Sequence, residues 1–121
     1  MNERSRQRLR DALRAARLID EHVRPVTLED SLADEWFRSA VDWQLVVVGE
    51  ALNDVRRAQP DFEDHFPKIH EWVAQRNVLI HLYDQIDDTM VWRVVRDELP
   101  SLIVALDQAL SPDIPSSEDQ E

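Results

Sequence analysis

One segment of the sequence combines residue types that can transfer a proton beside a phosphate. Residues 76–83 read R-N-V-L-I-H-L-Y and contain Arg76, Asn77, His81 and Tyr83. The guanidinium of an arginine stays charged and can donate two parallel hydrogen bonds to phosphate oxygens. A histidine exchanges protons near neutral pH and can serve as a general acid or base. Arg76 and His81 are therefore the first candidates for catalytic residues.

The apolar pattern around this segment makes the position of Arg76 unusual. In a helix, Arg76 lies at the centre of an apolar face whose other members fall within about 60° of it. Those members are Ile69, Trp72, Val73, Leu79, Ile80 and Tyr83. Buried arginines are rare unless they are paired, and an unpaired one costs several kcal/mol. We therefore expect Arg76 to meet an acid, a phosphate or a cleft between helices.

A second stripe of the same helix carries His70, Asn77 and His81. Asn77 and His81 are four residues apart, so their side chains can touch. On geometry alone, His81 is also explained as a helix histidine hydrogen-bonded to Asn77, and Tyr83 as an amphipathic core residue. Arg76 and His81 diverge by about 140° on a straight helix. One chain then supplies only part of a site, which gives dimerisation a physical reason.

The elements that must position these residues are helices. The chain has a single glycine, which argues against glycine-rich phosphate loops, dinucleotide-binding turns and tight hairpins. The apolar periodicity predicts an all-α fold, an antiparallel bundle of four to five helices. The predicted helices span residues 3–23, 27 to 57 or 58 with a break near 30–34, 67 to 83 or 84, and 87 or 88 to 110. Residues 59–66 are expected to form a loop, and Pro100 should kink the last helix.

The second predicted helix is expected to be central because apolar residues occur nearly all around it. One side of it is lined by Trp36, Ala40, Trp43, Val47 and Ala51. Gly49, the only glycine, lies inside this helix and costs about 1 kcal/mol relative to alanine. Close approach of another helix is the expected compensation.

Length and composition predict one small domain. The chain has 121 residues, of which 43% are hydrophobic, enough for a single core. We expect a helical domain over residues 1–110 and a disordered acidic tail over 111–121. The absence of cysteine excludes a disulfide framework, a thiolate zinc site and a cysteine nucleophile. No E-x-x-H pair occurs, so a dimetal bundle lacks its recurring ligands, and we expect neither a metal nor a cofactor.

The sequence predicts a cytoplasmic protein that does not enter the membrane. Nothing approaches 18 consecutive apolar residues, and the N-terminal sequence has no apolar core of the signal-peptide kind. The formal net charge is −11, which repels nucleic acid on average. An arginine stripe on the first helix, however, contains Arg6, Arg10, Arg14, Arg17 and Arg24. This stripe is either a solvated surface of ion pairs or a surface that contacts phosphates.

The motif segment resembles a known family. The spacing Arg76-Asn77-x-x-x-His81-x-Tyr83 is similar to the R-N-x-x-x-H-x-Y motif of HepT-like toxins, a branch of the HEPN ribonuclease superfamily. Residues 48–51, V-G-E-A, resemble the G-E-A of the family's long second helix. The run from Asp87 to Trp92, followed by Leu99-Pro100, resembles the family's D-x-x-x-x-W and L-P. The resemblance covers roughly residues 5–110.

The resemblance implies a fold, an activity and a partner. It implies a HEPN-type bundle that dimerises through the motif helix, so that two motifs meet at a cleft, and it implies metal-independent RNA cleavage. Arg76 and His81 would be catalytic and Asn77 supportive, and Glu50 is a guess for a residue that orients a motif side chain. The implied partner is an MNT-type nucleotidyltransferase antitoxin of a type VII-like toxin–antitoxin pair, which adds AMP to Tyr83 and silences the toxin.

Two functional hypotheses remain open at this point. RNA carries its own nucleophile, the 2′-hydroxyl, so a histidine and an arginine suffice for cleavage if both are well placed. The first hypothesis is therefore a ribonuclease toxin that forms a homodimer or a higher homo-oligomer. The second is a non-catalytic helical dimer that binds a nucleotidyltransferase or nucleotides and uses the same motif for docking or modification. The sequence does not separate these hypotheses, because the same residues serve both.

Overall fold

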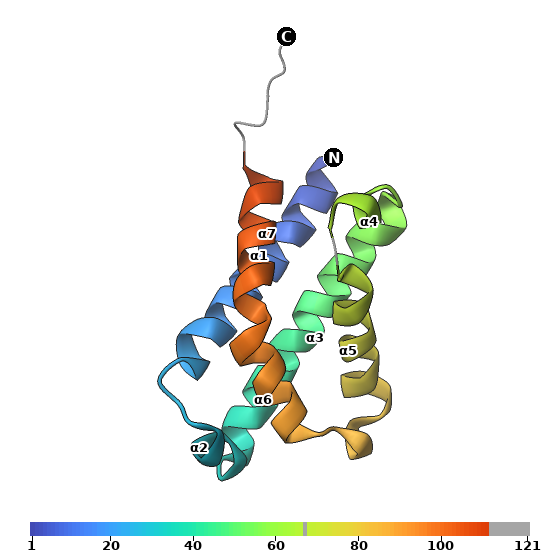
Figure 1. Ribbon diagram of the computed structural model, residues 1–121. Coiled ribbons are helices and arrows are strands. Elements are labelled where there is room, and N and C mark those ends of the chain that lie inside the picture. Colours follow the sequence, from blue (N-terminus) through green and yellow to red (C-terminus); the bar gives the residue numbers. More distant parts are fainter. Residues whose placement is uncertain (67, 112–121) are drawn as a thin grey trace.

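The computed structural model describes residues 1–66 and 68–111, except for the side chain of His65. Within that part the chain is entirely helical, with no strand, which confirms the predicted all-α class (Figure 1). The elements are α1 (Glu3–Val23), α2 (Leu28–Leu32), α3 (Glu35–Ala58), α4 (Phe62–His65), α5 (Ile69–His81), the 3-10 helix η1 (Tyr83–Gln85), α6 (Asp88–Asp97) and α7 (Leu99–Leu110). Pro67, the predicted start of the third helix, and residues 112–121 of the predicted tail lie outside the described residues.

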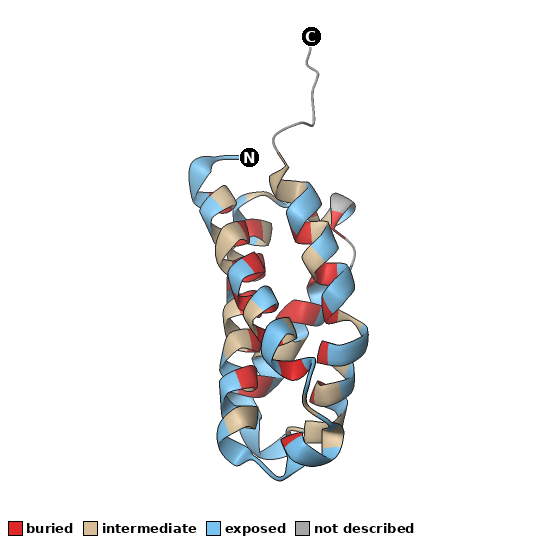
Figure 2. Cartoon of the chain, turned by 90° about the vertical axis from the view of Figure 1, so that its left-hand side faces the viewer, coloured by how far each residue is buried: buried red, intermediate tan, exposed pale blue. Residues whose placement is uncertain are grey.

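The long helices form an antiparallel bundle with four corners. Helix α3 packs along α1 on one side and along α5 on the other, and α7 packs along α1. Helices α6 and α7 together make the fourth corner and run back up the bundle (Figure 1). Buried residues face the inside of this bundle, whereas its outer surface is exposed (Figure 2). The α3–α5 seam carries most of the candidate site.

Short polar side chains cap the N-termini of α1, α2, α3 and α6. Asn2 Oδ1 accepts the backbone N–H of Ser5 at 2.8 Å and begins α1. Thr27 caps α2, and Asp34 accepts the backbone N–H of Phe37 at 3.0 Å and begins α3. Such caps satisfy N–H groups that have no partner inside the helix. The second predicted helix is thus two helices, and the predicted break within it is confirmed.

The last predicted helix is also two helices. Helix α6 ends at Asp97, α7 begins at Leu99, and Pro100 falls in the first turn of α7. Proline is tolerated there because the N–H it lacks would have no helical partner. The predicted kink is therefore a helix break. The predicted loop 59–66 also contains the short helix α4.

Of the five residues expected to line one side of α3, four are not in the core. The indole of Trp36 is 87% exposed and that of Trp43 is 62% exposed. Ala40 is also exposed, Val47 is half-buried and only Ala51 is in the core. The core of α3 instead faces α1 and α5 through Leu45, Val48, Leu52 and Val55. An apolar stripe is therefore left uncovered in the single chain.

Candidate functional site

Arg76 is held between helices α3 and α5. Its side chain is 20% exposed, and its Nη2 lies 2.7 Å from Oε1 of Glu50. Its Nη1 donates to Oδ1 of Asn77 at 2.7 Å, while its Nε is buried without a partner. The expectation that Arg76 meets an acid is confirmed. The guanidinium is thus fixed on one side and still has an unused donor.

Gly49 allows this arrangement. A Cβ atom at Gly49 would lie 2.3 Å from Cβ of Arg76 and 2.9 Å from the carbonyl oxygen of Trp72. These separations are far below van der Waals contact, so α5 can approach α3 this closely only at a glycine. The predicted close approach at Gly49 is confirmed. The next residue, Glu50, then lies within reach of the guanidinium.

His81 is the last residue of α5 and its side chain is exposed. The expected hydrogen bond between Asn77 and His81 is not formed, because Oδ1 of Asn77 accepts from Arg76 instead. Among the described residues, no hydrogen bond or ion pair involves the imidazole of His81. The structure therefore brings Arg76, Asn77 and Glu50 together and leaves His81 free at the end of the helix.

Tyr83 does not lie on the motif helix. Helix α5 ends at His81, Leu82 leaves the helical conformation with φ −129° and ψ 40°, and Tyr83 opens η1. Its side chain is 74% exposed, so the expected packing of the ring on the apolar face is wrong. The chain must leave the helix here to reach Asp87, whose carboxylate caps α6. The phenol therefore stands in solvent beyond the end of the motif helix.

A second polar cluster adjoins the site, and sequence reasoning found only one of its members. His70 Nε2 lies 2.5 Å from Oε1 of Glu63, and His70 Nδ1 lies 3.4 Å from Nη1 of Arg56. Arg56 also donates to Oδ1 of Asn53 at 2.6 Å. His70 was recognised from its stripe with Asn77 and His81. Its partners come from α3 and α4, so periodicity within one helix gives no signal for them.

The half-buried carboxyl of Asp42 lies where α3 meets Asp88 of α6. The pKa of Asp42 is raised from 3.8 to about 6, mainly by burial and next by the nearby carboxylate of Asp88, against the opposing charge of Arg38. Arg38 itself pairs with Asp88 at 3.3 Å. Asp42 lies seven residues, about two helical turns, before Gly49 on α3, and its charged neighbours are Arg38 and Asp88, so we expect it to act on stability.

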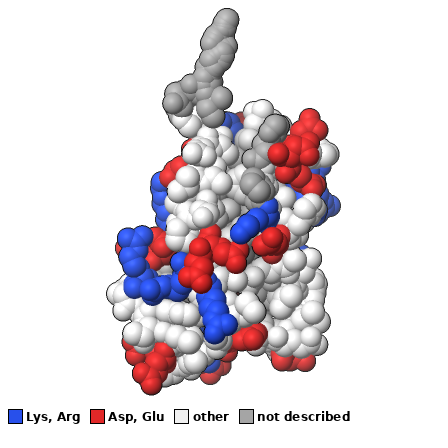
Figure 3. Space-filling view, viewed as in Figure 1, with Lys and Arg blue, Asp and Glu red and all other residues white. Residues whose placement is uncertain are grey.

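The arginine stripe of α1 is largely engaged within the chain. Arg17 forms two hydrogen bonds with Asp107 of α7 at 2.8 and 2.9 Å, and Arg10 pairs with Glu3 at 2.6 Å. Arg24 pairs with Asp20, and Arg6 donates to the carbonyl oxygen of Leu110. On the face shown in Figure 3, basic side chains lie among acidic ones and no continuous basic surface forms. The structure favours the interpretation of a solvated surface of ion pairs.

The described residues contain no group of three or more histidine and acidic side chains placed to hold a metal ion. No helix within 1–66 and 68–111 is long and apolar enough to cross a membrane.

Comparison with known proteins assigns the family. A model of the family "Ribonuclease HepT-like" matches residues 12–109, which include every motif residue discussed above. The chain belongs to the HepT-like family. It is 34% identical over 96 residues to "Probable ribonuclease HepT" of Thermococcus cleftensis, covering 78% of this chain and 84% of that protein. It is 30% identical over 96 residues to "Putative RNase MJ1380" of Methanocaldococcus jannaschii, covering 78% of this chain and 85% of that protein.

No solved structure gives a significant match to this HepT-like chain. The family model and the two relatives confirm the family resemblance seen in residues 76–83.

Proposed function

We propose that this HepT-like chain is a ribonuclease toxin that cleaves RNA without a metal ion. One observation carries the proposal: the motif arginine, Arg76, is fixed between Glu50 and Asn77 at the α3–α5 seam, and its guanidinium keeps further N–H donors beyond these two contacts. Membership of the HepT-like family and the printed names of its relatives support RNA as the substrate class.

The proposed reaction is an internal transfer of the phosphate. The 2′-hydroxyl loses its proton to His81 and attacks the adjacent phosphorus, forming a 2′-O–P bond. The bond from phosphorus to the 5′-oxygen breaks, and that oxygen takes up a proton, which leaves a 2′,3′-cyclic phosphate. Arg76 donates hydrogen bonds to the non-bridging oxygens, where negative charge develops. Glu50 keeps the guanidinium pointed at this position.

We propose that two chains complete the site. Trp36 and Trp43 lie seven residues apart on α3, and Glu50 follows after seven more, so all three share one side of the helix. The exposed apolar stripe of Trp36, Ala40, Trp43 and Val47 therefore leads directly to the Arg76 site. Large exposed apolar patches are typical of interaction surfaces. A homodimer over this stripe would place the Arg76 site of one chain near His81 of the other.

We further propose that an MNT-type nucleotidyltransferase silences the protein by adding AMP to Tyr83. The exposure of the phenol supports access by a second protein. An added phosphate would bring negative charge to the end of the motif helix, where it would compete with RNA for arginine.

The proposal is tested by incubating purified protein with RNA, with and without a chelator. We expect cleavage that resists the chelator and leaves cyclic phosphate ends. The His81→Ala variant should lose about 10²–10⁴-fold in rate, as expected for a lost proton-transfer group. Equal rates for the variant and the wild-type protein, or a rate abolished by chelator, would overturn the mechanism.

A further inference from the structure

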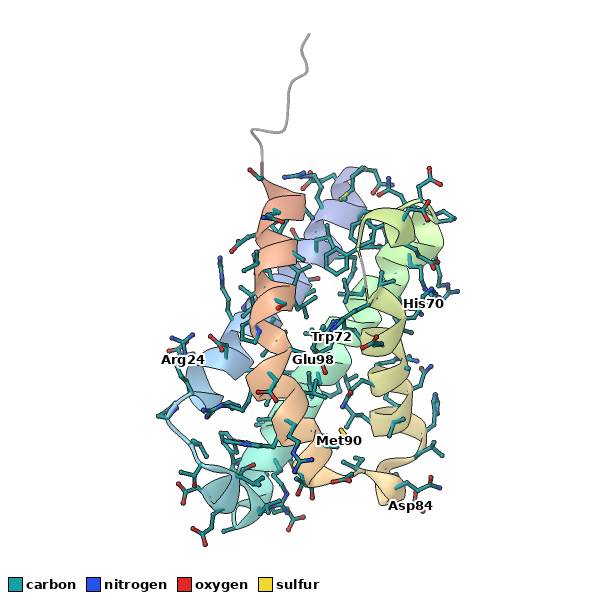
Figure 4. All side chains as sticks on the ribbon, in the orientation of Figure 1. Arg24, His70, Trp72, Asp84, Met90 and Glu98 are labelled. Atoms are coloured by element: carbon teal, nitrogen blue, oxygen red, sulfur yellow. The ribbon has the colours of Figure 1, made fainter. Side chains whose placement is uncertain are left out.

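The α3–α5 seam continues beyond Arg76 toward a second group of polar side chains. At one level Glu50 of α3 meets Arg76 of α5, and at the next level Arg56 of α3 meets His70 of α5. The steps of six residues along each antiparallel helix correspond to roughly 10 Å. Figure 4 shows His70 on the outer side of α5, whereas Trp72 points into the bundle. On α5, His70 shares a stripe with Asn77 and His81, so the second level lies along the side of the motif helix that carries the histidine.

The charge of Arg56 is not neutralised within the described chain. Its hydrogen-bond partners are Oδ1 of Asn53 at 2.6 Å and Nδ1 of His70 at 3.4 Å, and neither is an anion. No carboxylate of the described residues forms an ion pair with it, and its Nε is buried without a partner. A half-buried guanidinium with unfilled donors is a binding group for a phosphate.

His70 is held in a defined orientation beside Arg56. An arginine has only donors, so Nδ1 of His70 accepts from it, and the ring proton lies on Nε2. Nε2 then donates to Glu63 of α4 at 2.5 Å. The carboxylate fixes the ring, as outer carboxylates commonly fix functional histidines. With both nitrogens engaged, the ring stays 67% exposed next to Arg56 and offers a fixed surface on which a ribose or base can pack.

We propose that Arg56 and His70 form a second contact site for the RNA strand, roughly 10 Å along the seam from the cleavage site. Arg56 binds a backbone phosphate, His70 contacts the neighbouring ribose or base, and Glu63 positions His70. A short stretch of single-stranded RNA can span the two levels, whereas a dinucleotide cannot. This inference rests on the proposed ribonuclease function and adds to it a determinant of substrate length.

The test compares a dinucleotide with a dodecanucleotide RNA as substrates. We expect Arg56→Gln to raise KM for the dodecanucleotide about tenfold or more, as for one lost charge-assisted hydrogen bond. The kcat on both substrates and the KM for the dinucleotide should stay unchanged. His70→Gln should act in the same direction. The matched control is Arg57→Gln, which removes the same charge from the next, exposed position of α3.

Two results would overturn the proposed contact site. An equal rise in KM for Arg57→Gln would reduce the effect to overall charge and overturn the contact site. A loss of dinucleotide cleavage in Arg56→Gln would also overturn it, because the residue would then act on the cleavage site itself.

A binding measurement tests the contact site separately from the proposed ribonuclease activity. Fluorescence anisotropy with labelled dodecanucleotide on the His81→Ala background measures Kd without cleavage. If the wild-type protein cleaves no RNA but Arg56→Gln still weakens binding tenfold, the proposed function fails and the contact site stands. An unchanged Kd overturns the contact site, and circular dichroism melting verifies that each variant is folded.

Discussion

At the scale of single residues, the site depends on how Arg76 is held. Its guanidinium shares its donors between Glu50 and Asn77, so a phosphate that enters must bind the remaining edge or replace one of these partners. Glu50 is half exposed, which leaves room for such an exchange. We therefore propose that Glu50 is a positioning residue that acts on substrate through Arg76.

The Glu50→Gln variant tests this positioning role. Loss of the ion pair frees the guanidinium, and we expect kcat for RNA cleavage to fall about tenfold while the fold persists, in line with a charged hydrogen bond of roughly 1.5–3 kcal/mol. Arg76→Ala should lose more, since it removes the group itself. Glu71→Gln, an exposed acid in the first turn of α5, is the charge-matched control and should cleave normally. A Glu50→Gln enzyme as fast as the wild-type protein would rule out the role.

Tyr83 carries the prediction about silencing. Because the phenol is exposed and lies outside the helix, Tyr83→Phe should fold and melt like the wild-type protein. After co-expression with a cognate nucleotidyltransferase, intact-mass measurement should show an AMP adduct on the wild-type chain alone. An adduct on both proteins, or on neither, would remove Tyr83 from the mechanism.

The sequence predicts some residue contacts well and others not at all. It required for Arg76 an acid, a phosphate or a cleft between helices, because an unpaired buried guanidinium is costly, and the structure supplies the acid Glu50. It placed Tyr83 wrongly, because a helical wheel does not show where the helix ends, and the end is set by the turn toward Asp87. It missed the pairing of His70 with Arg56 and Glu63, because three separate helices bring these residues together.

At the scale of helices, Gly49 decides the distance between α3 and α5. In an open helix position, glycine to alanine stabilises by about 1 kcal/mol. Here the new Cβ would meet Arg76 Cβ at 2.3 Å, so the helices must separate. We expect Gly49→Ala to destabilise by about 1–3 kcal/mol, the usual cost of overpacking, and to reduce RNA cleavage by shifting Arg76.

Urea unfolding of Gly49→Ala measures the sign of this effect. Ser39→Ala, an exposed position of the same helix, serves as the control and should be neutral or slightly stabilising. A Gly49→Ala protein more stable than the wild-type protein would mean that the seam tolerates a side chain.

The contact of α3 with α6 should make stability depend on pH through Asp42. Its pKa is raised from 3.8 to about 6, so between these values the folded chain binds more protons than the unfolded chain. The contribution of this carboxyl to the free energy of unfolding is therefore most favourable at low pH, and it is lost as the pH rises through about 6. Asp42→Asn should stabilise at pH 7.5, by about 1 kcal/mol after allowance for its partial exposure to water, and have little effect near pH 4.

Thermal melts at both pH values test this expectation, with the exposed Asp61→Asn as the control. An Asp42→Asn variant that is less stable at pH 7.5 than the wild-type protein would contradict it.

At the scale of the whole molecule, the stripe on α3 presents two large exposed side chains, Trp36 and Trp43. Apolar periodicity marks Trp36 and Trp43 as buried but does not say whether the same chain or another chain covers them. Since the bundle buries α3 toward α1 and α5, these indoles stay exposed in the single chain. The notion of a central helix was right, and the assignment of its buried side required the packing.

A charge placed in this stripe should prevent dimerisation. We expect Trp43→Glu to remain folded, because the indole is 62% exposed, and to sediment as a monomer where the wild-type protein is a dimer. RNA cleavage should fall with dimerisation if the site needs two chains. Glu29→Gln, on the exposed surface of α2, should leave the dimer unchanged. A monomeric wild-type protein at micromolar concentration would contradict the proposal.

The last prediction asks which chain supplies each catalytic residue. Arg76 turns toward α3, whereas His81 stands free at the end of α5 with no partner among the described residues. If a site combines Arg76 of one chain with His81 of the other, a dimer of one Arg76→Ala chain and one His81→Ala chain keeps one intact site of two. Random mixing makes about half of the dimers mixed, and each mixed dimer has one working site instead of two. About a quarter of the wild-type activity should therefore return when the two inactive proteins are combined. The measurement is RNA cleavage after the two variants are unfolded and refolded together, compared with each refolded alone. A mixture that stays inactive while native mass spectrometry shows mixed dimers would place both residues of each site on the same chain.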